Sequence, residues 1–170
     1  MKTVKSFFIL LIFVLPQYMA GAQGTAKITS KDMNRFAGHW QGSLTYLDYS
    51  TGKPYTMPAN VYIKTLEKGR KYEFARVYPN EPKANSTDTF SLSTDGKMLN
   101  NEAVTRNRKL ANGNMKIVTE TRGKDGNDNK MALIRHTYTV GKHAFSIIKE
   151  VQFEGEQVWI KRHEYAYTKE

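Results

Sequence analysis

Alternation of apolar and polar side chains over residues 131–168 constrains the fold more than any other feature of this sequence. The segments 131–140, 144–153 and 157–168 each have a period of two, which indicates strands with one face toward an interior. Two glycine-containing loops, Gly141-Lys142 and Gly155-Glu156, separate them and are typical of tight hairpins. The C-terminal third is therefore predicted to be three strands that pair in order along the chain.

The same pattern extends back to Trp40. Trp40, Gly42, Leu44 and Tyr46 share one parity of a first strand. An open meander of about nine strands would leave two long edges, and closure removes them. We therefore predict an all-β fold, a single antiparallel up-and-down β-barrel of about eight to ten strands, preceded by a short helix or coil over 23–35. The remaining strands are expected near residues 59–66, 71–78, 87–93, 97–106 and 115–122.

The first 22 residues have the organisation of a secretory signal peptide. Lys2 and Lys5 precede an apolar run over 7–15, and Ala20-Gly21-Ala22 is a small-residue cleavage site. The apolar run is too short to span a bilayer comfortably. We therefore predict a signal peptide over 1–22, one barrel domain over 23–170, and no stable membrane insertion after cleavage.

Cysteine and charge narrow the class of protein further. The chain has no cysteine, which in an exported domain favours a bacterial source and a soluble product in the periplasm or outside the cell. It also excludes thiolate metal sites and cysteine nucleophiles. The formal net charge is +10, but the basic residues are scattered and no nucleic-acid motif is present, so nucleic acid is not expected as a partner.

Turn geometry predicts which side chains of the last three strands share a face. If Gly141-Lys142 and Gly155-Glu156 are two-residue turns, Tyr138 lies opposite Phe145, and Lys149 lies opposite Arg162. The more aliphatic face then becomes the interior. That face comprises Ala132, Ile134, His136, Tyr138, Val140, Phe145, Ile147, Lys149, Val151, Phe153, Val158, Ile160, Arg162, Glu164 and Ala166.

Four titratable side chains on this expected interior, His136, Lys149, Arg162 and Glu164, admit two interpretations. Buried charge is costly unless it is paired. The four groups can form a closed structural cluster, in which Glu164 bridges Lys149 and Arg162. Alternatively, they line a wet cavity whose basic groups meet an acidic ligand head. Both interpretations stay open from sequence.

Catalytic and metal motifs are weak. In the predicted register His136 and His163 face opposite ways and cannot share a metal, and the polar loop 123–129 lacks the closing Glu of a calcium loop. No metal site or cofactor is therefore predicted. His136 and Glu164 are conceivable acid–base partners, yet no nucleophile motif accompanies them, and enzymatic activity stays undecided.

The segment Phe36-Ala37-Gly38-His39-Trp40 resembles the Gly-x-Trp motif that begins the barrel of calycins, the superfamily of lipocalins and fatty-acid-binding proteins. This resemblance implies that Trp40 closes one end of the barrel and that Arg162 from the last strand packs across it. The Arg162–Tyr165 segment is also similar to the Arg-x-Tyr ending of fatty-acid-binding proteins, which binds a ligand carboxylate. Its spacing differs by one residue, which puts Tyr165 on the face opposite Arg162.

These observations lead to three functional hypotheses. The first is an exported lipocalin-like protein that binds a small hydrophobic or amphipathic ligand, including an acidic one. The second is a cavity-less barrel that serves as an envelope-associated protein-interaction module, with an unknown partner. The third is a haem-binding or small enzymatic barrel that uses His136. For the first, the expected ligand-binding residues are His136, Tyr138, Phe145, Ile147, Lys149, Arg162 and Glu164.

Overall fold

The computed structural model describes residues 26–48, 51–126 and 129–170; the predicted signal peptide lies outside these residues. One short helix, α1 (Ser30–Met33), and one 3-10 turn, η1 (Pro82–Ala84), accompany the strands. No helix within the described ranges is long and apolar enough to cross a membrane. The described strands are β1 (Gly38–Asp48), β2 (Lys53–Glu67), β3 (Lys71–Val77), β4 (Ser86–Ser91), β5 (Met98–Leu99), β6 (Glu102–Lys109), β7 (Met115–Asp125), β8 (Lys130–Val140), β9 (Ala144–Phe153) and β10 (Ile160–Lys169).

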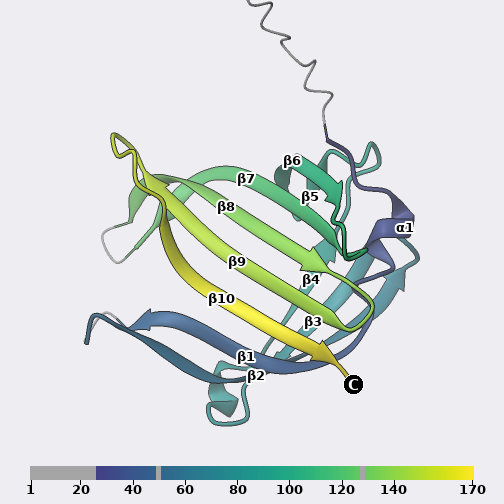
Figure 1. Cartoon of the computed structure of the whole chain (residues 1–170), viewed down its shortest axis with the longest axis horizontal. Coiled ribbons are helices and arrows are strands. Elements are labelled where there is room, and N and C mark those ends of the chain that lie inside the picture. Colours follow the sequence, from purple (N-terminus) through teal and green to yellow (C-terminus); the bar gives the residue numbers. More distant parts are fainter. Residues whose placement is uncertain (1–25, 49–50, 127–128) are drawn as a thin grey trace, which may run out of the picture.

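These strands form one antiparallel sheet that curls into a nearly closed barrel (Figure 1). Neighbours follow chain order, except that β10 returns to pair with β1, so the sheet runs β4-β3-β2-β1-β10-β9-β8-β7-β6-β5. At the seam, an isolated bridge joins Leu92, just after β4, to Leu99 in β5. The predicted all-β, up-and-down barrel is therefore confirmed.

Two strand boundaries differ from the predicted ones for identifiable reasons. β2 begins at Lys53, not near residue 59, and includes Pro54 and Pro58. β3 pairs with β2 only from Asn60 onward, so the prolines lie where one edge of β2 has no partner strand among the described residues. The single strand expected over 97–106 is instead β5 and β6, because consecutive asparagines with φ of 53° and 65° form a tight turn at 100–101.

The β8–β9 hairpin is shifted by two residues from the predicted register. Val140 pairs with Phe145, and Tyr138 pairs with Ile147. Gly141, which begins the loop, does not have a positive φ, so backbone conformation does not explain the glycine. Its close packing does, because a Cβ there would lie 2.0 Å from Oδ1 of Asn114. A shift of two keeps every side chain on its predicted face, since faces alternate with a period of two.

A β-bulge in β10 reverses the predicted faces of that strand. The predicted pair Val151–Ile160 is confirmed, but the register shifts between Lys161 and His163. One extra residue in a strand moves all following side chains to the other face. His163 consequently pairs with Lys149, the position predicted for Arg162. The predicted inward positions of Glu164 and Ala166 are therefore wrong, and His163, Tyr165 and Tyr167 face the interior in their place.

One end of the barrel is closed by apolar packing, and we call it the floor. Met33 of α1 and Phe36 are fully buried there, and the indole Nε1 of Trp40 donates a hydrogen bond to the Phe36 carbonyl at 2.9 Å. Lys169, which pairs with Trp40, holds its Nζ 4.9 Å from the indole ring centroid. Arg162 lies seven residues before Lys169 in β10, which places it about 20 Å from Lys169 along the strand. The cation expected over Trp40 is thus Lys169, and the predicted Trp40–Arg162 closure is wrong.

Candidate functional site: the mouth half of the barrel interior

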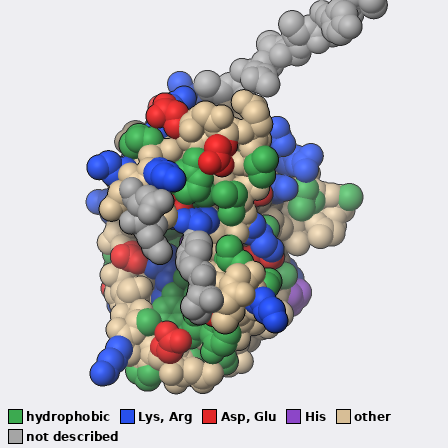
Figure 2. Space-filling model, turned by 90° about the vertical axis from the view of Figure 1, so that its left-hand side faces the viewer, with side chains coloured by type: hydrophobic (Ala, Val, Ile, Leu, Met, Phe, Trp, Pro, Cys, Tyr) green, Lys and Arg blue, Asp and Glu red, His purple; other side chains and the backbone are tan. Residues whose placement is uncertain are grey.

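Inward-facing side chains are buried at the floor, whereas several of them are only partly buried toward the opposite end, the mouth. Near the floor, the paired residues Met115, Val140, Phe145 and Tyr167 are all buried. Toward the mouth, Val151 and Ala132 are also buried, but Ile134, Lys149 and Phe153 retain part of their accessible surface. Figure 2 views the mouth end, where basic and hydrophobic side chains lie in a recess between the strand ends. Water therefore reaches the mouth half of the interior, whereas the floor is packed.

A run of cross-strand pairs places five side chains at one level of the barrel. Thr119 pairs with His136, His136 with Lys149, Lys149 with His163, and His163 with Tyr46. Directly paired residues share a face, with Cβ atoms about 5 Å apart. Lys149 is therefore flanked by an imidazole on each side. We call these five residues the mouth row.

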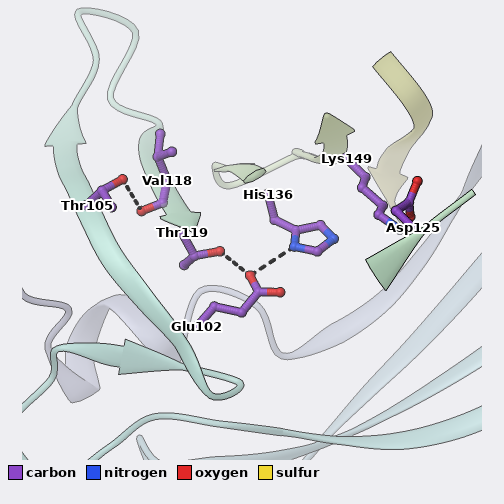
Figure 3. Close-up of polar contacts among 7 residues, drawn as sticks. All are labelled: Glu102, Thr105, Val118, Thr119, Asp125, His136 and Lys149. Carbon is purple, nitrogen blue, oxygen red and sulfur yellow. Dashed lines mark hydrogen bonds and ion pairs between the residues drawn. The ribbon is translucent and has the colours of Figure 1, made fainter. Parts of the chain in front are cut away.

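Glu102 fixes one end of the mouth row. Its Oε2 accepts a hydrogen bond from the Thr119 hydroxyl and lies 2.9 Å from Nδ1 of His136 (Figure 3). The Glu102 and His136 side chains are 15% and 20% exposed, so the pair is largely shielded from water. The turn at 100–101 places Glu102 at the start of β6 and so positions its side chain beside Thr119 and His136. A carboxylate on Nδ1 favours the proton on that nitrogen and leaves Nε2 as the acceptor of the neutral ring.

Asp125 organises a second cluster, closer to the mouth. Nζ of Lys149 donates to its Oδ1 at 2.5 Å, and Nε of Arg162 donates to its Oδ2 at 2.6 Å. The Asp125 side chain is 9% exposed, so its charge depends on these two cations. Arg162 also lies 5.9 Å from the centroid of the Phe153 ring. Two strands distant in sequence, β7 and β10, are thereby linked across the interior.

Burial and nearby cations disfavour the protonated form of His163. The pKa of His163 falls from 6.5 to about 4, first because burial disfavours the charged ring, and then because Lys149, His136 and Arg76 repel a further positive charge. Asp125 opposes this effect only in part. His163 is therefore neutral at pH 7. Lys149 and Arg162 are the cations nearest this interior, and Asp125 and Glu102 are its carboxylates.

Aromatic side chains cover the level below the mouth row. The hydroxyls of Tyr165 and Tyr78 are 2.8 Å apart, and the rings of Tyr165 and Tyr167 are stacked with centroids 5.8 Å apart. Burial raises the pKa of Tyr138, and the charge of Glu102 raises it further. Burial likewise raises the pKa of Tyr165 and Tyr167. Tyr138, Tyr165 and Tyr167 are therefore protonated and uncharged at neutral pH.

The predicted ligand-binding residues separate into three groups. His136, Lys149 and Arg162 meet in the mouth half, while Tyr138 and Ile147 form the level beneath. Phe145 belongs to the packed floor, 1% exposed. Glu164 faces outward and accepts a hydrogen bond from Lys161 at 2.9 Å. The predicted Glu164 bridge between Lys149 and Arg162 is therefore wrong, and Asp125 occupies that role.

Sequence reasoning missed Glu102, Asp125 and His163. Asp125 has the same parity as Met115 and Ile117 in β7, so a longer strand prediction would have placed it inward. Glu102 and His163 depend on the asparagine turn and on the bulge, for which the sequence pattern holds no clear signal. The inference that His136 and His163 face opposite ways is also wrong. Even so, no group of three or more potential metal ligands is present among the described residues.

Comparison with known proteins gives little beyond this geometry. No family model matches the chain, and no curated protein matches it. Among solved structures, the crystal structure of Rv2717c from M. tuberculosis matches with a TM-score of 0.48 and 12% sequence identity. The match covers 82% of this chain and 96% of that chain.

Proposed function

We propose that this protein is a calycin-like carrier that binds a small amphipathic molecule with an acidic group in the mouth half of its barrel. The observation that carries the proposal is the mouth row, in which Lys149, 21% exposed, lies between His136 and His163 in a partly hydrated interior. An acidic head would meet Lys149 and Arg162. The apolar part would lie against the tyrosines of the level below, above the closed floor.

Calycin membership is part of this proposal. Its support is the Gly38-His39-Trp40 segment at the start of β1, the ten-strand meander, and the return of β10 to β1. Export is likewise proposed, from the signal-peptide pattern over 1–22. The mass of the protein recovered from its secretory compartment tests export, since cleavage after Ala22 yields a chain that begins at Gln23. An uncleaved chain that stays in the cytoplasm would refute it.

Binding is tested with 1-anilinonaphthalene-8-sulfonate, a fluorescent amphipathic anion. We expect saturable binding that weakens at least tenfold in Lys149→Met, because the variant removes the ammonium from the mouth row. Lys142→Met, at an exposed position in the β8–β9 turn, is the matched control and should bind as the wild type does. Equal binding by both variants would show that the dye binds elsewhere and would refute the proposal. Native mass spectrometry of gently purified protein would then identify the natural ligand as an added mass that denaturation releases.

The alternative of a protein-interaction module has less structural support than the carrier function. Its contact surface would lie on the outer face of the barrel, and the aromatic side chains of Tyr165 and Tyr167 in β10 face the interior instead. A groove on the outer face of β6–β9 favours this alternative. Arg135 lines the groove, and its guanidinium lies 3.7 Å from the centroid of the Trp159 ring. Loss of a co-purifying protein on Trp159→Ala, with dye binding unchanged, would support it.

The third hypothesis, a haem-binding or enzymatic barrel, rests on His136. The specific observation in its favour is the Glu102–His136 pair, since a carboxylate commonly orients a histidine that ligates a metal or accepts a proton. A haem absorption band that forms in the wild type and is absent in His136→Phe would support the haem form of this hypothesis.

A further inference from the structure

From the Glu102–His136–Lys149 geometry, we infer that the ligand carries a hydrogen-bond donor, a hydroxyl group, close to its acidic group, and that it belongs to the class of hydroxylated aromatic acids. The inference rests on the proposed carrier function and adds the second polar group of the ligand. Nε2 of His136 receives the hydroxyl, and Lys149, which also donates to Asp125 at 2.5 Å, receives the acid.

The first step is the orientation of the His136 ring. Glu102 is itself held by the Thr119 hydroxyl, and Thr119 is fully buried, so the carboxylate at Nδ1 is fixed in position. Within the described part of the chain, Nε2 has no hydrogen-bond partner. Figure 3 shows this nitrogen pointing away from Glu102, on the side of the ring where Lys149 and Asp125 lie. An oriented acceptor is therefore presented to the interior beside an ammonium group.

The second step is the spacing of the two ligand groups. His136 and Lys149 are directly paired on adjacent strands and face the same way, so their Cβ atoms are about 5 Å apart. A ligand that satisfies both side chains must carry its donor and its acid within a few ångströms of each other. A monocarboxylate without a hydroxyl would leave Nε2 unpaired once the ligand displaced water, and an unpaired polar group weakens binding.

The third step is the body of the ligand. In the level below the mouth row, Tyr138 is buried, whereas Tyr165 is partly exposed and lies parallel to Tyr167 with an interplanar angle of 12°. Flat ring faces favour offset stacking with another aromatic ring. Tyr46 adds a further ring within the mouth row itself. A hydroxybenzoate-like ring fits this chemistry better than a flexible alkyl chain does.

The test compares benzoate with its three hydroxy and three methoxy isomers by isothermal titration calorimetry at pH 8. We expect at least one hydroxybenzoate to bind roughly five- to tenfold more tightly than its methoxy counterpart and benzoate. In His136→Phe this preference should disappear while benzoate affinity is retained. Glu102→Gln serves as a second variant, because its amide can donate to Nδ1 and convert Nε2 to a donor; the preference should shrink there as well.

The outcomes separate this inference from the proposed function. If Lys149-dependent dye binding is observed but no isomer shows a hydroxyl preference, the inference is overturned and the carrier function stands. A preference that persists in both His136→Phe and Glu102→Gln also overturns it. If dye binding itself does not depend on Lys149, both fail. Circular dichroism checks the fold of each variant, and if His136→Phe is unfolded, Glu102→Gln decides the result.

Discussion

The imidazole of His163 illustrates how the barrel interior changes the chemistry of one side chain. In an unfolded chain it would titrate near 6.5, but burial and neighbouring cations lower its pKa to about 4. The protonated ring is thus less stable in the folded protein than in the unfolded one. The neighbouring carboxylate of Asp125 differs from His163 in having two cationic partners, Lys149 and Arg162.

Acidification should destabilise the protein through His163. The unfolded state binds a proton near pH 6.5 and the folded state only near pH 4, so this contribution is fully present above pH 6.5 and is lost as pH falls toward 4. The full difference corresponds to roughly 3 kcal/mol. Urea unfolding at pH 7.5 and pH 5 should show a smaller pH dependence in His163→Gln than in the wild type. His143→Gln, exposed in the β8–β9 loop, should keep the wild-type dependence, and identical behaviour of the two variants would contradict the prediction.

Neutralising Asp125 should be far more costly than neutralising an exposed carboxylate. Asp125→Asn removes the charge that Lys149 and Arg162 share in a 9%-exposed position, and breaking a buried ion pair costs about 3–5 kcal/mol. The matched control is Glu154→Gln, whose partner Arg122 is 3.8 Å away and 75% exposed, and it should cost less than about 1 kcal/mol. Chemical denaturation measures both. Similar losses would mean that water screens Asp125 as well.

At the scale of elements, two small irregularities decide what the barrel contains. The alternation of β8 and β9 was sufficient to predict which of their side chains face inward, since a register error of two residues leaves faces unchanged. The bulge in β10 inserts one residue and therefore reverses the faces of the residues that follow. His163 consequently faces the interior, where Glu164 was predicted. The asparagine turn similarly divided one predicted strand in two and brought Glu102 inward. Periodicity alone does not reveal a single inserted residue, because the pattern on each side of it is equally regular.

Substitutions on β10 distinguish the two faces directly. Tyr165→Phe removes the hydroxyl that lies 2.8 Å from the Tyr78 hydroxyl and should reduce stability by about 1 kcal/mol. Glu164→Gln removes an exposed pair with Lys161 and should cost less than about 0.5 kcal/mol. Thermal unfolding of the two variants tests this ranking. The reverse order would place Glu164 inside and the bulge elsewhere.

At the scale of the whole molecule, the barrel combines a packed floor with a hydrated mouth. The sequence predicted closure because an open meander would expose its edges, and the resemblance to calycins implied that Trp40 lies at one end. It did not predict that Lys169 covers Trp40, since that depends on the register of β10 against β1. Nor does alternation reveal how burial varies along the barrel axis, because inward-facing residues have the same pattern at the floor and at the mouth.

Substitution of two phenylalanines on the same strand and the same face tests the difference in packing between floor and mouth. Phe145 is 1% exposed at the floor end of β9, where it contacts the rings of Phe36 and Trp40, whereas Phe153 is partly exposed at the mouth end. Phe145→Ala should cost about 3–5 kcal/mol, because it leaves a cavity that packed neighbours cannot fill. Phe153→Ala should cost less than half as much, since water already reaches that side chain and can occupy the space. Urea unfolding compares the two variants, and equal losses would indicate a barrel packed solidly along its whole length, with no room for a ligand at the mouth.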